Sequence, residues 1–299
     1  MSEIAAADPD QAAFRDLIGA IRPELHRYCA RLTGSVIDGE DVVQDAVARA
    51  LASYGTLRDG AALRAWLFRI AHNRALDLLR ERAVRAAEPL EAASDMADEE
   101  RPDPLDQLMR QEALATAISR FIELPTAQRS AVILKDVLGH RLDDIAGLLD
   151  LSIDAVKAHL ARGRARLREI NARAPAEPIR RAYSAANQLY VDLFNRRDWD
   201  ALRTLLTEDV RLNQATHPIR TGVSAGMFFT IYARHPGVRL APAWLDGEEV
   251  IAVFESGADS MPHHFMRIDW CDDRIAAIRD FRYVPYVMEG ADLMLDDGA

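Results

Sequence analysis

The spacing of apolar residues divides the chain into a helical part and a part that contains strands. Apolar side chains recur three and four positions apart over residues 11–85 and again over 107–172, with turn signals at Thr33-Gly34 and Tyr54-Gly55 and a break at Leu124-Pro125. After residue 178 we predict helices over about 179–197 and 198–207, followed by strands rich in β-branched and aromatic residues. The predicted strands are Val210–Asn213, Val238–Trp244, Glu249–Glu255, His263–Cys271 and Ile275–Val284. This order predicts two all-α blocks followed by an α+β domain.

Two proline-containing segments separate these blocks. Residues 86–106 contain three prolines and eight acidic residues against Arg101 alone, so they cannot bury enough apolar surface to offset the entropy of ordering. We predict a flexible linker there and a second, short linker at 174–178. The predicted domains and linkers are a helical domain at 1–85, the acidic linker at 86–106, a helical domain at 107–173, the short linker at 174–178, an α+β domain at 179–290 and an acidic tail at 291–299.

Composition argues against several classes of protein. No apolar run approaches the roughly 20 residues that cross a bilayer. The N-terminus lacks the basic and apolar regions of a signal peptide. Cys29 and Cys271 lie far apart and offer no thiolate cluster for zinc, which suits a reducing cytoplasm, where we expect the protein. We expect no cofactor and no metal ion.

The segment from Ser152 to Arg168 gives the strongest indication of function. Ser152 is a good N-cap for a helix. The predicted apolar face of that helix consists of Ile153, Val156, Leu160 and Leu167, and its basic residues lie mostly off this face. A shorter amphipathic helix and a tight turn precede it at 142–151. Together these features predict a helix-turn-helix whose second helix enters a DNA major groove. A solvated basic face on an ordinary helical hairpin is the alternative.

The distribution of charge supports DNA binding more than the net charge of −10 opposes it. Residues 63–85 carry six arginines against two acids, and residues 152–173 carry one lysine and five arginines against two acids. Each segment is therefore about +4 by count within an acidic protein. An acidic protein with two basic helices is typical of one that takes most of its DNA affinity from a larger partner.

Three motifs within residues 11–172 resemble those of the extracytoplasmic-function (ECF) sigma factors of the sigma-70 family, the two-domain promoter-recognition subunits of bacterial RNA polymerase. Asp38–Leu51 resembles the polymerase-binding helix, Arg64–Arg80 the helix that reads and opens the −10 element, and Leu124–Arg129 with the helix-turn-helix the module that reads the −35 element. The resemblance implies that 1–85 is sigma region 2 and 107–173 is sigma region 4. It also implies a non-enzymatic sigma factor that directs promoter-specific initiation.

The first motif carries the candidate polymerase-binding residues. Asp41 and Asp45 are one helical turn apart and Gln44 lies beside them, so one face offers carboxylates and an amide to a basic partner. The resemblance implies that this partner is the clamp of the largest polymerase subunits, and that region 4 contacts the flap. A solvated acidic face is the alternative. A simple helix-turn-helix repressor would have no need of such a polymerase-facing helix.

The other two motifs carry the candidate DNA contacts. Melted DNA needs a stacking surface and a cationic track. The candidates for the −10 element are Trp66, Arg69, His72, Asn73 and Arg80. Of these, Asn73 can pair with an adenine edge and Arg80 can hold a phosphate, whereas Trp66 is alternatively a core residue. We expect His72 on the exposed face, in contact with nucleic acid and not with a metal. The candidates for the −35 element are Ser152, Lys157, Arg162 and Arg164. The acidic linker is either a mere tether or, as in relatives, a segment on the path of nascent RNA.

The segment Tyr190–Val210 resembles the opening of SnoaL-like domains, which have a cone-shaped α+β fold. Some ECF sigma factors carry such a domain at the C-terminus, so the resemblance implies regulation in cis. Side chains available to a pocket are His217, His235, His263, His264, Asp269 and Tyr283, and ordinary structural or surface histidines are the alternative. We assign no catalytic residue. The alternative function is a bifunctional protein whose SnoaL-like domain binds or converts a small hydrophobic molecule.

Overall fold

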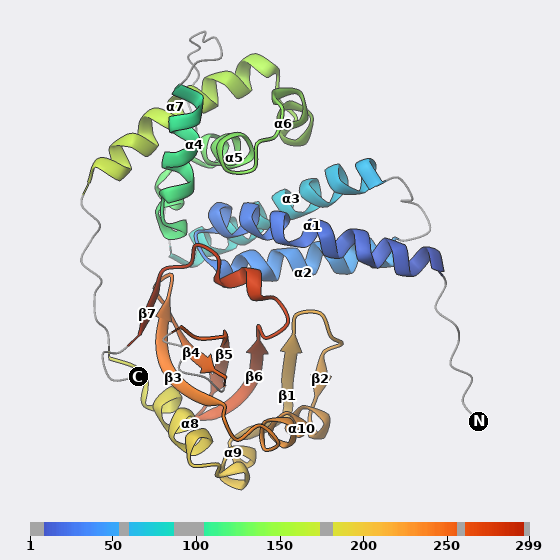
Figure 1. Cartoon of the computed structure of the whole chain (residues 1–299), viewed down its shortest axis with the longest axis vertical. Coiled ribbons are helices and arrows are strands. Elements are labelled where there is room, and N and C mark those ends of the chain that lie inside the picture. The colour runs from blue at the N-terminus through green and yellow to red at the C-terminus, as the bar shows by residue number, and fades with distance from the viewer. Residues whose placement is uncertain (1–8, 54–59, 87–104, 174–181, 256–260, 296–299) are drawn as a thin grey trace. The chain divides into compact units, whose positions relative to one another are not determined.

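Three long helices open the chain, as the apolar spacing predicts. They are α1 (Pro9–Thr33), α2 (Val36–Ala52) and α3 (Gly60–Ala86). The computed structural model describes residues 9–53, 60–86, 105–173, 182–255 and 261–295 (Figure 1). Most of the linker predicted at 86–106, the whole linker predicted at 174–178 and the turn predicted at Tyr54-Gly55 lie outside the described residues. The chain divides into two units, a helical unit of residues 1–176 and a C-terminal unit of residues 177–299.

A close contact between α1 and α2 fixes the start of the fold. Ser35 is the N-cap of α2, and its hydroxyl accepts a hydrogen bond from the backbone N–H of Asp38 at 3.3 Å. Gly39 lies against α1 so closely that an added Cβ would approach the backbone of Ala30 to 2.6 Å. The absence of a side chain at this position therefore lets the two helices meet.

The second helical block consists of short elements and one long helix. They are α4 (Leu105–Ala115), a 3-10 helix (Ile118–Glu123), α5 (Thr126–Val132), a π-helical turn (Ile133–Val137), α6 (Leu142–Leu149) and α7 (Ile153–Ala172). The break predicted at Leu124-Pro125 is confirmed, because Pro125 is the N-cap of α5. One buried cluster contains apolar residues from both helical blocks. Among them are Leu25 of α1, Phe68 of α3, Ile133 of the π-helical turn and Val156 of α7.

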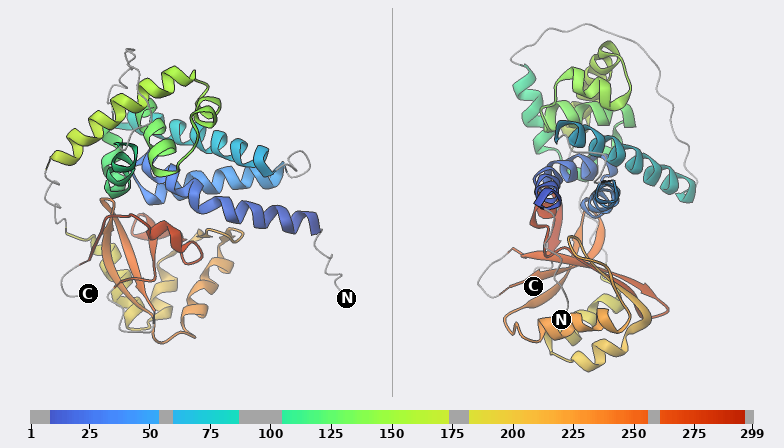
Figure 2. Two further views of the ribbon diagram at one scale, coloured as in Figure 1. Left: turned by 45° about the horizontal axis from the view of Figure 1, so that its top comes forward. Right: turned by 90° about the vertical axis from the view of Figure 1, so that its right-hand side faces the viewer.

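The unit formed by residues 177–299 contains a curved sheet covered on one face by helices (Figure 2). The helices are α8 (Ala185–Asn195), α9 (Trp199–Thr204) and α10 (Val223–Tyr232). The strands are β1 (Leu206–Gln214), β2 (Arg220–Thr221), β3 (Arg239–Leu245), β4 (Glu248–Phe254), β5 (His264–Cys271), β6 (Arg274–Asp280) and β7 (Leu293–Leu295). Their order in the seven-stranded sheet is β2-β1-β6-β5-β4-β3-β7. Strands β1 and β6 pair in parallel, and the other neighbours are antiparallel.

All five predicted strands are present, and the structure adds elements that the sequence did not indicate. The helix expected over 198–207 ends at Thr204, and the strand expected over 275–284 ends at Asp280. Helix α10 was not predicted, because its sequence is apolar on all sides and lacks a helical period. Within the segment expected to be an acidic tail, residues 293–295 form β7, which pairs with β3. No described helix is both long and apolar enough to span a membrane.

Candidate functional site

Helix α2 separates the acidic residues of its motif into an inner and an outer set. Asp38 and Glu40 are buried, and they form ion pairs with Arg82 of α3 and Arg22 of α1. The outer set consists of Asp41 and Gln44, which are half-buried, and Asp45, which is exposed. Because the side chains of the outer set are more exposed than those of Asp38 and Glu40, the outer set is the part of the motif that a partner can reach. The spacing of the acids in the sequence does not distinguish the two sets.

One face of α3 carries four of the five residues predicted to contact the −10 element. Trp66, Arg69, Asn73 and Arg80 follow one another at intervals of three, four and seven residues, so they share a helix face. Arg69, Asn73 and Arg80 are exposed, whereas Trp66 is half-buried and packs partly against the core. This arrangement combines an aromatic edge with two cationic groups and an amide, the features that we predicted for a surface that holds melted DNA.

His72 does not lie on the exposed face of α3, where we expected it. It is half-buried, and its Nδ1 lies 2.7 Å from the hydroxyl of Tyr28 on α1. Burial, reinforced by the charge of Arg80, lowers the pKa of His72 to about 4, so the ring is neutral at pH 7. Burial also raises the pKa of Tyr28, so the phenol keeps its proton and its O–H donates a hydrogen bond to Nδ1 of His72. His72 can therefore present at most a neutral Nε2–H to a ligand.

Helices α6 and α7 form the predicted helix-turn-helix. Asp150 ends α6 in the left-handed conformation with φ of 56°, and the N–H of Leu151 returns to the carbonyl of Ala146 at 3.0 Å. Ser152 then caps α7, and its hydroxyl accepts from the N–H of Ala155 at 3.1 Å, which confirms the predicted N-cap. Gly163 lets α7 approach α5, since an added Cβ would lie 2.7 Å from Val132. The turn and the close packing of α7 on α5 hold the basic helix in place.

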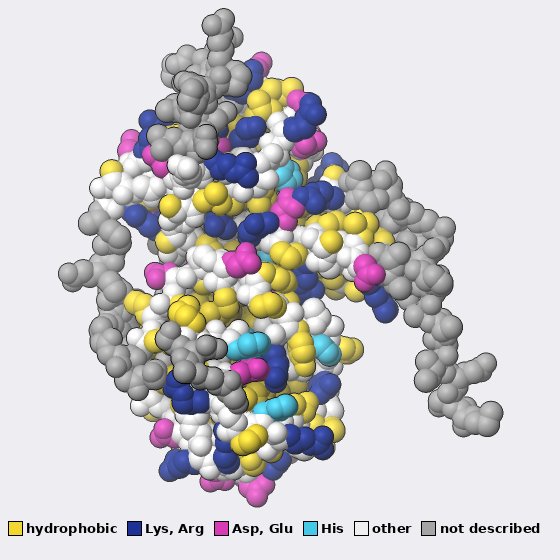
Figure 3. Space-filling model, in the orientation of Figure 1, with side chains coloured by type: hydrophobic (Ala, Val, Ile, Leu, Met, Phe, Trp, Pro, Cys, Tyr) yellow, Lys and Arg dark blue, Asp and Glu magenta, His cyan; other side chains and the backbone are white. Residues whose placement is uncertain are grey.

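The basic residues of α7 have different surroundings. Lys157 is exposed near the N-terminal end of α7, and Arg162 is half-buried. Arg164 makes a bidentate ion pair with the buried Asp136, at 2.9 and 2.7 Å, and its side chain is only 16% exposed. This partner of Arg164 was not predicted. Of the predicted apolar face, Ile153, the first residue of α7, is 41% exposed. On the face shown in Figure 3, basic and acidic side chains are interspersed over the helical unit.

Arg129 is a structural residue that the sequence analysis did not single out as one. Its guanidinium donates to the carbonyl of Leu32 at the end of α1 at 2.6 Å, and to those of Ile122 and Leu124 at 2.8 Å each. Burial lowers its pKa to about 10, which leaves it charged at pH 7. Arg129 thus ties the end of α1 to the turn that precedes α5.

The six side chains considered for a pocket in the C-terminal unit do not come together at one site. His217 packs against Tyr283 with ring centroids 4.3 Å apart, His235 is exposed, and Asp269 pairs with Arg267 and Arg279. His264 is buried, and His263 is its exposed neighbour. A surface pocket of about 420 Å³ lies instead between β1 and α10, and none of the six residues lines it.

Comparison with known proteins agrees with the arrangement of the helical unit. The family description "Sigma-70 region 2" matches residues 17–85, and "Sigma-70, region 4" matches residues 117–167. The first match covers α2 and most of α3, and the second covers α5, α6 and most of α7.

Individual relatives extend this comparison. The ECF RNA polymerase sigma factor SigM of Mycobacterium tuberculosis (strain H37Rv) is 36% identical over 160 residues, which cover 53% of this chain and 76% of SigM. The ECF RNA polymerase sigma factor SigG of the same organism is 27% identical over 309 residues, which cover 92% of this chain and 82% of SigG. Among solved structures, that of the extracytoplasmic function sigma factor SigJ of M. tuberculosis is similar over 89% of this chain and 95% of that chain, with 22% identity and a TM-score of 0.33.

Proposed function

Because the chain belongs to the ECF sigma factors, the non-catalytic subunits that bind core RNA polymerase and promoter DNA and direct promoter-specific initiation, we propose that helices α2, α3 and α7 divide these tasks. Helix α2 binds the polymerase clamp through Asp41, Gln44 and Asp45. The observation that carries this assignment is the difference in burial along α2. Asp38 and Glu40 are buried, whereas Asp41 and Gln44 are half-buried and Asp45 is exposed. Core-binding measurements on charge-reversed α2 test it and are described in the Discussion.

Helix α3 reads and opens the −10 element in this proposal. Arg69 and Arg80 hold phosphates, Asn73 reads a base edge, and the partly exposed Trp66 offers a ring on which a base stacks. Arg80 now pairs with Asp77 at 2.8 Å, but both side chains are more than half exposed. Such a pair is weak, so a phosphate can take the place of the carboxylate. His72, held by Tyr28, fixes the orientation of the helix and adds no charge.

Helix α7 reads the −35 element, with its N-terminal half in the major groove and region 4 against the polymerase flap. Lys157 and Arg162 are five positions apart, so they project about 140° apart around the helix axis. A helix in the groove has a phosphate backbone on either side, so the two side chains are placed to contact opposite strands. Ser152 adds a contact at the helix N-terminus. We assign Arg164 a positioning role through Asp136, because the carboxylate already engages its guanidinium.

Replacing Lys157 and Arg162 together by alanine is expected to weaken promoter binding by the loss of two phosphate contacts. Each lost contact should reduce the slope of log affinity against log salt by about one. Binding of holoenzyme to a promoter fragment, measured over a series of salt concentrations, gives this slope. Arg166→Ala is the matched control, since Arg166 is exposed on α7 but pairs with Glu169 near the far end of the helix. An unchanged salt slope in the double variant would contradict the placement of α7 in the groove.

We also propose that the C-terminal unit is a SnoaL-like cone that regulates the sigma domains in cis. Its curved sheet, covered on one face by α8, α9 and α10, supports this assignment, and the similarity to SigG extends over 92% of the chain. Residues 176–299 carry 19 acids against 13 bases, so this unit can compete with DNA for basic helices. The tether near Pro175 and Pro178 is short, which keeps the unit at a high effective concentration. Inhibition in cis is the sense of regulation that we favour.

Truncation after Ala174 is expected to raise promoter-dependent transcription, because it removes the acidic competitor and leaves the helical unit with its own core. Multiple-round transcription with equal amounts of full-length and truncated chain measures the effect, and saturating core enzyme separates activity from recruitment. Lower activity on truncation would show that the unit supports the active arrangement. Equal activity would contradict regulation in cis.

A further inference from the structure

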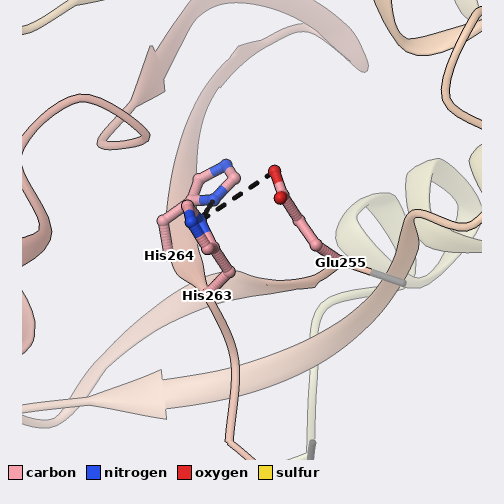
Figure 4. A group of neighbouring side chains, drawn as sticks. All are labelled: Glu255, His263 and His264. Carbon is pink, nitrogen blue, oxygen red and sulfur yellow. Dashed lines mark hydrogen bonds and ion pairs between the residues drawn. The ribbon is translucent and has the colours of Figure 1, made fainter. Parts of the chain in front are cut away.

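Three potential metal ligands meet where β4 ends and β5 begins (Figure 4). The Nδ1 atoms of His263 and His264 are 2.9 Å apart, and Oε1 of Glu255 lies 4.0 Å from Nδ1 of His263. One ligand atom from each of the three side chains lies within 4.8 Å of the others. The site is open to solvent on one side, since the side chain of His263 is 46% exposed and that of Glu255 is 36% exposed. Histidine side chains also reach the surface of this unit in Figure 3.

The backbone explains why these ligands converge. Neighbouring residues within a strand point to opposite faces of the sheet, but His263 precedes β5, so its side chain is free of this alternation. The N–H of His263 donates to the carbonyl of Val253 at 2.8 Å, which holds the approach to β5 against β4. Val253 pairs with His264 in the ladder, and Glu255 follows two residues later. The pairing of the two strands therefore sets the distance between the carboxylate and the imidazoles.

His264 is oriented for metal binding by groups deeper in the unit. Its Nε2 lies 3.2 Å from Oδ1 of Asp280, whose side chain is fully buried, and 3.3 Å from the hydroxyl of Tyr232. Asp280 is itself held by Gln214, which donates to Oδ2 at 2.8 Å. A carboxylate at Nε2 fixes the proton on that nitrogen, so the lone pair is on Nδ1 and faces His263 and Glu255. Carboxylate–histidine pairs of this kind orient the ligands of zinc sites.

We propose that Glu255, His263 and His264 bind a divalent transition-metal ion of the zinc class, with Asp280 as the group that orients His264. Two histidine nitrogens and one carboxylate are a ligand set of open zinc sites, which leave a fourth position to water. Nitrogen ligands of a tetrahedral zinc ion are about 3.3 Å apart. The two Nδ1 atoms therefore need to separate only slightly, and a rotation of the exposed His263 ring provides this movement. Without metal, the Nδ1–H of His263 donates a hydrogen bond to Nδ1 of His264. When a metal ion binds, His263 changes tautomer, so that its proton is on its own Nε2 and its Nδ1 is free to bind the ion.

The charges around the site are compatible with a cation. Arg282 donates to Oε1 of Glu255 at 2.8 Å and lies over the ring of Tyr232. Oε1 is also the oxygen that lies 4.0 Å from His263, so Glu255 binds the metal ion either through Oε2 or by sharing Oε1, and its two oxygens have lone pairs for both Arg282 and the metal ion. The buried carboxylate of Asp280 lies one imidazole away from the metal position, and it offsets the positive charge that a metal ion would place on His264.

Metal binding by the full-length chain tests this proposal. The protein is purified without a histidine tag, stripped with a chelator, and titrated with Zn²⁺ by calorimetry and with Co²⁺ by visible absorption. We expect one ion per chain and the intense visible absorption of a tetrahedral cobalt site. His263→Ala changes an exposed side chain and Glu255→Gln a half-buried one, and we expect each to weaken binding by about 100-fold or more.

Two control variants distinguish the site from incidental binding. His235→Ala removes an exposed histidine of the same unit, and Cys271→Ser removes an exposed cysteine. Both should bind as the unaltered chain does. Circular dichroism of each variant shows whether the unit remains folded. Absence of stoichiometric binding, unchanged binding in His263→Ala and Glu255→Gln, or loss of binding in Cys271→Ser would overturn the proposal.

Discussion

The Asp41→Arg, Asp45→Arg double variant is expected to lose binding to core RNA polymerase while its helical unit remains folded. Both carboxylates lie on the outer face of α2, and reversal places two positive charges against a surface that we propose to be basic. Like charges brought together at an interface cost several kcal/mol, so we expect affinity to fall by at least about 100-fold. Folding should change little, because the pair that Asp45 makes with Arg74 at 2.9 Å is partly exposed and therefore weak.

The comparison needs a control with the same change in net charge. Asp192→Arg, Asp200→Arg reverses two exposed acids of the C-terminal unit, which does not carry the proposed polymerase-binding residues. Asp38 and Glu40 are unsuitable as controls, because both are buried in ion pairs, and replacement of Glu40 would leave the buried Arg22 without this carboxylate. Affinity is measured by titration of labelled core enzyme, and folding by circular dichroism and thermal melting. Wild-type affinity in the α2 variant would contradict the proposal that α2 binds the polymerase.

Arg129→Ala is expected to lower the free energy of unfolding of the helical unit by about 3 kcal/mol or more. The substitution removes the donor to the carbonyls of the buried Leu32 and Leu124 and to that of the exposed Ile122. Arg129→Lys should restore only part of the loss, since an ammonium group lacks the planar fork that reaches several carbonyls at once.

A chain ending at Ala174 makes this measurement specific to the helical unit. That chain contains Trp66 as its single tryptophan, so its fluorescence in urea reports the unfolding of this unit alone. Arg166→Ala is the control and should change stability by less than about 0.5 kcal/mol, as expected of an exposed residue. A loss of less than 1 kcal/mol in Arg129→Ala would show that water or other donors satisfy the three carbonyls, contrary to the role that we give Arg129.

The helical unit could be predicted from the sequence because its signals are local. The helical spacing of apolar residues, the N-cap at Ser152 and the break at Leu124-Pro125 each depend on residues within a few positions of one another. Ile153 shows the limit of this reasoning. It lies at the right spacing for the apolar face, but it is the first residue of α7 and is 41% exposed.

The roles of individual charged and polar side chains could not be predicted, because their partners lie far away in the sequence. Asp38 pairs with Arg82, and Arg164 pairs with Asp136. The hydroxyl of Tyr28 contacts His72, although the two residues are 44 positions apart in the sequence. A motif reveals that a helix is acidic or basic, but only the packing of helices decides which of its charges face inwards.

In the C-terminal unit the sequence indicated the five longer strands, but it did not indicate α10, β7 or the proposed metal site. Helix α10 lacks an amphipathic period, and β7 is defined by its pairing with β3. We expected no metal ion, and in the sequence neither Glu255 nor the pair His263 and His264 forms a ligand motif by itself. The β4–β5 ladder brings them together, and Asp280 completes the arrangement from β6.

Reconstituted transcription tests the central claim most directly. Core RNA polymerase from the source organism is incubated with fragments of its genome, with and without the purified chain, and the 5′ ends of the transcripts are mapped. If the chain is a sigma factor, it will produce a defined set of start sites that share sequences near −10 and −35, and the Asp41→Arg, Asp45→Arg variant will not. Transcripts identical to those of core enzyme alone, with a chain shown to be folded, would contradict the account.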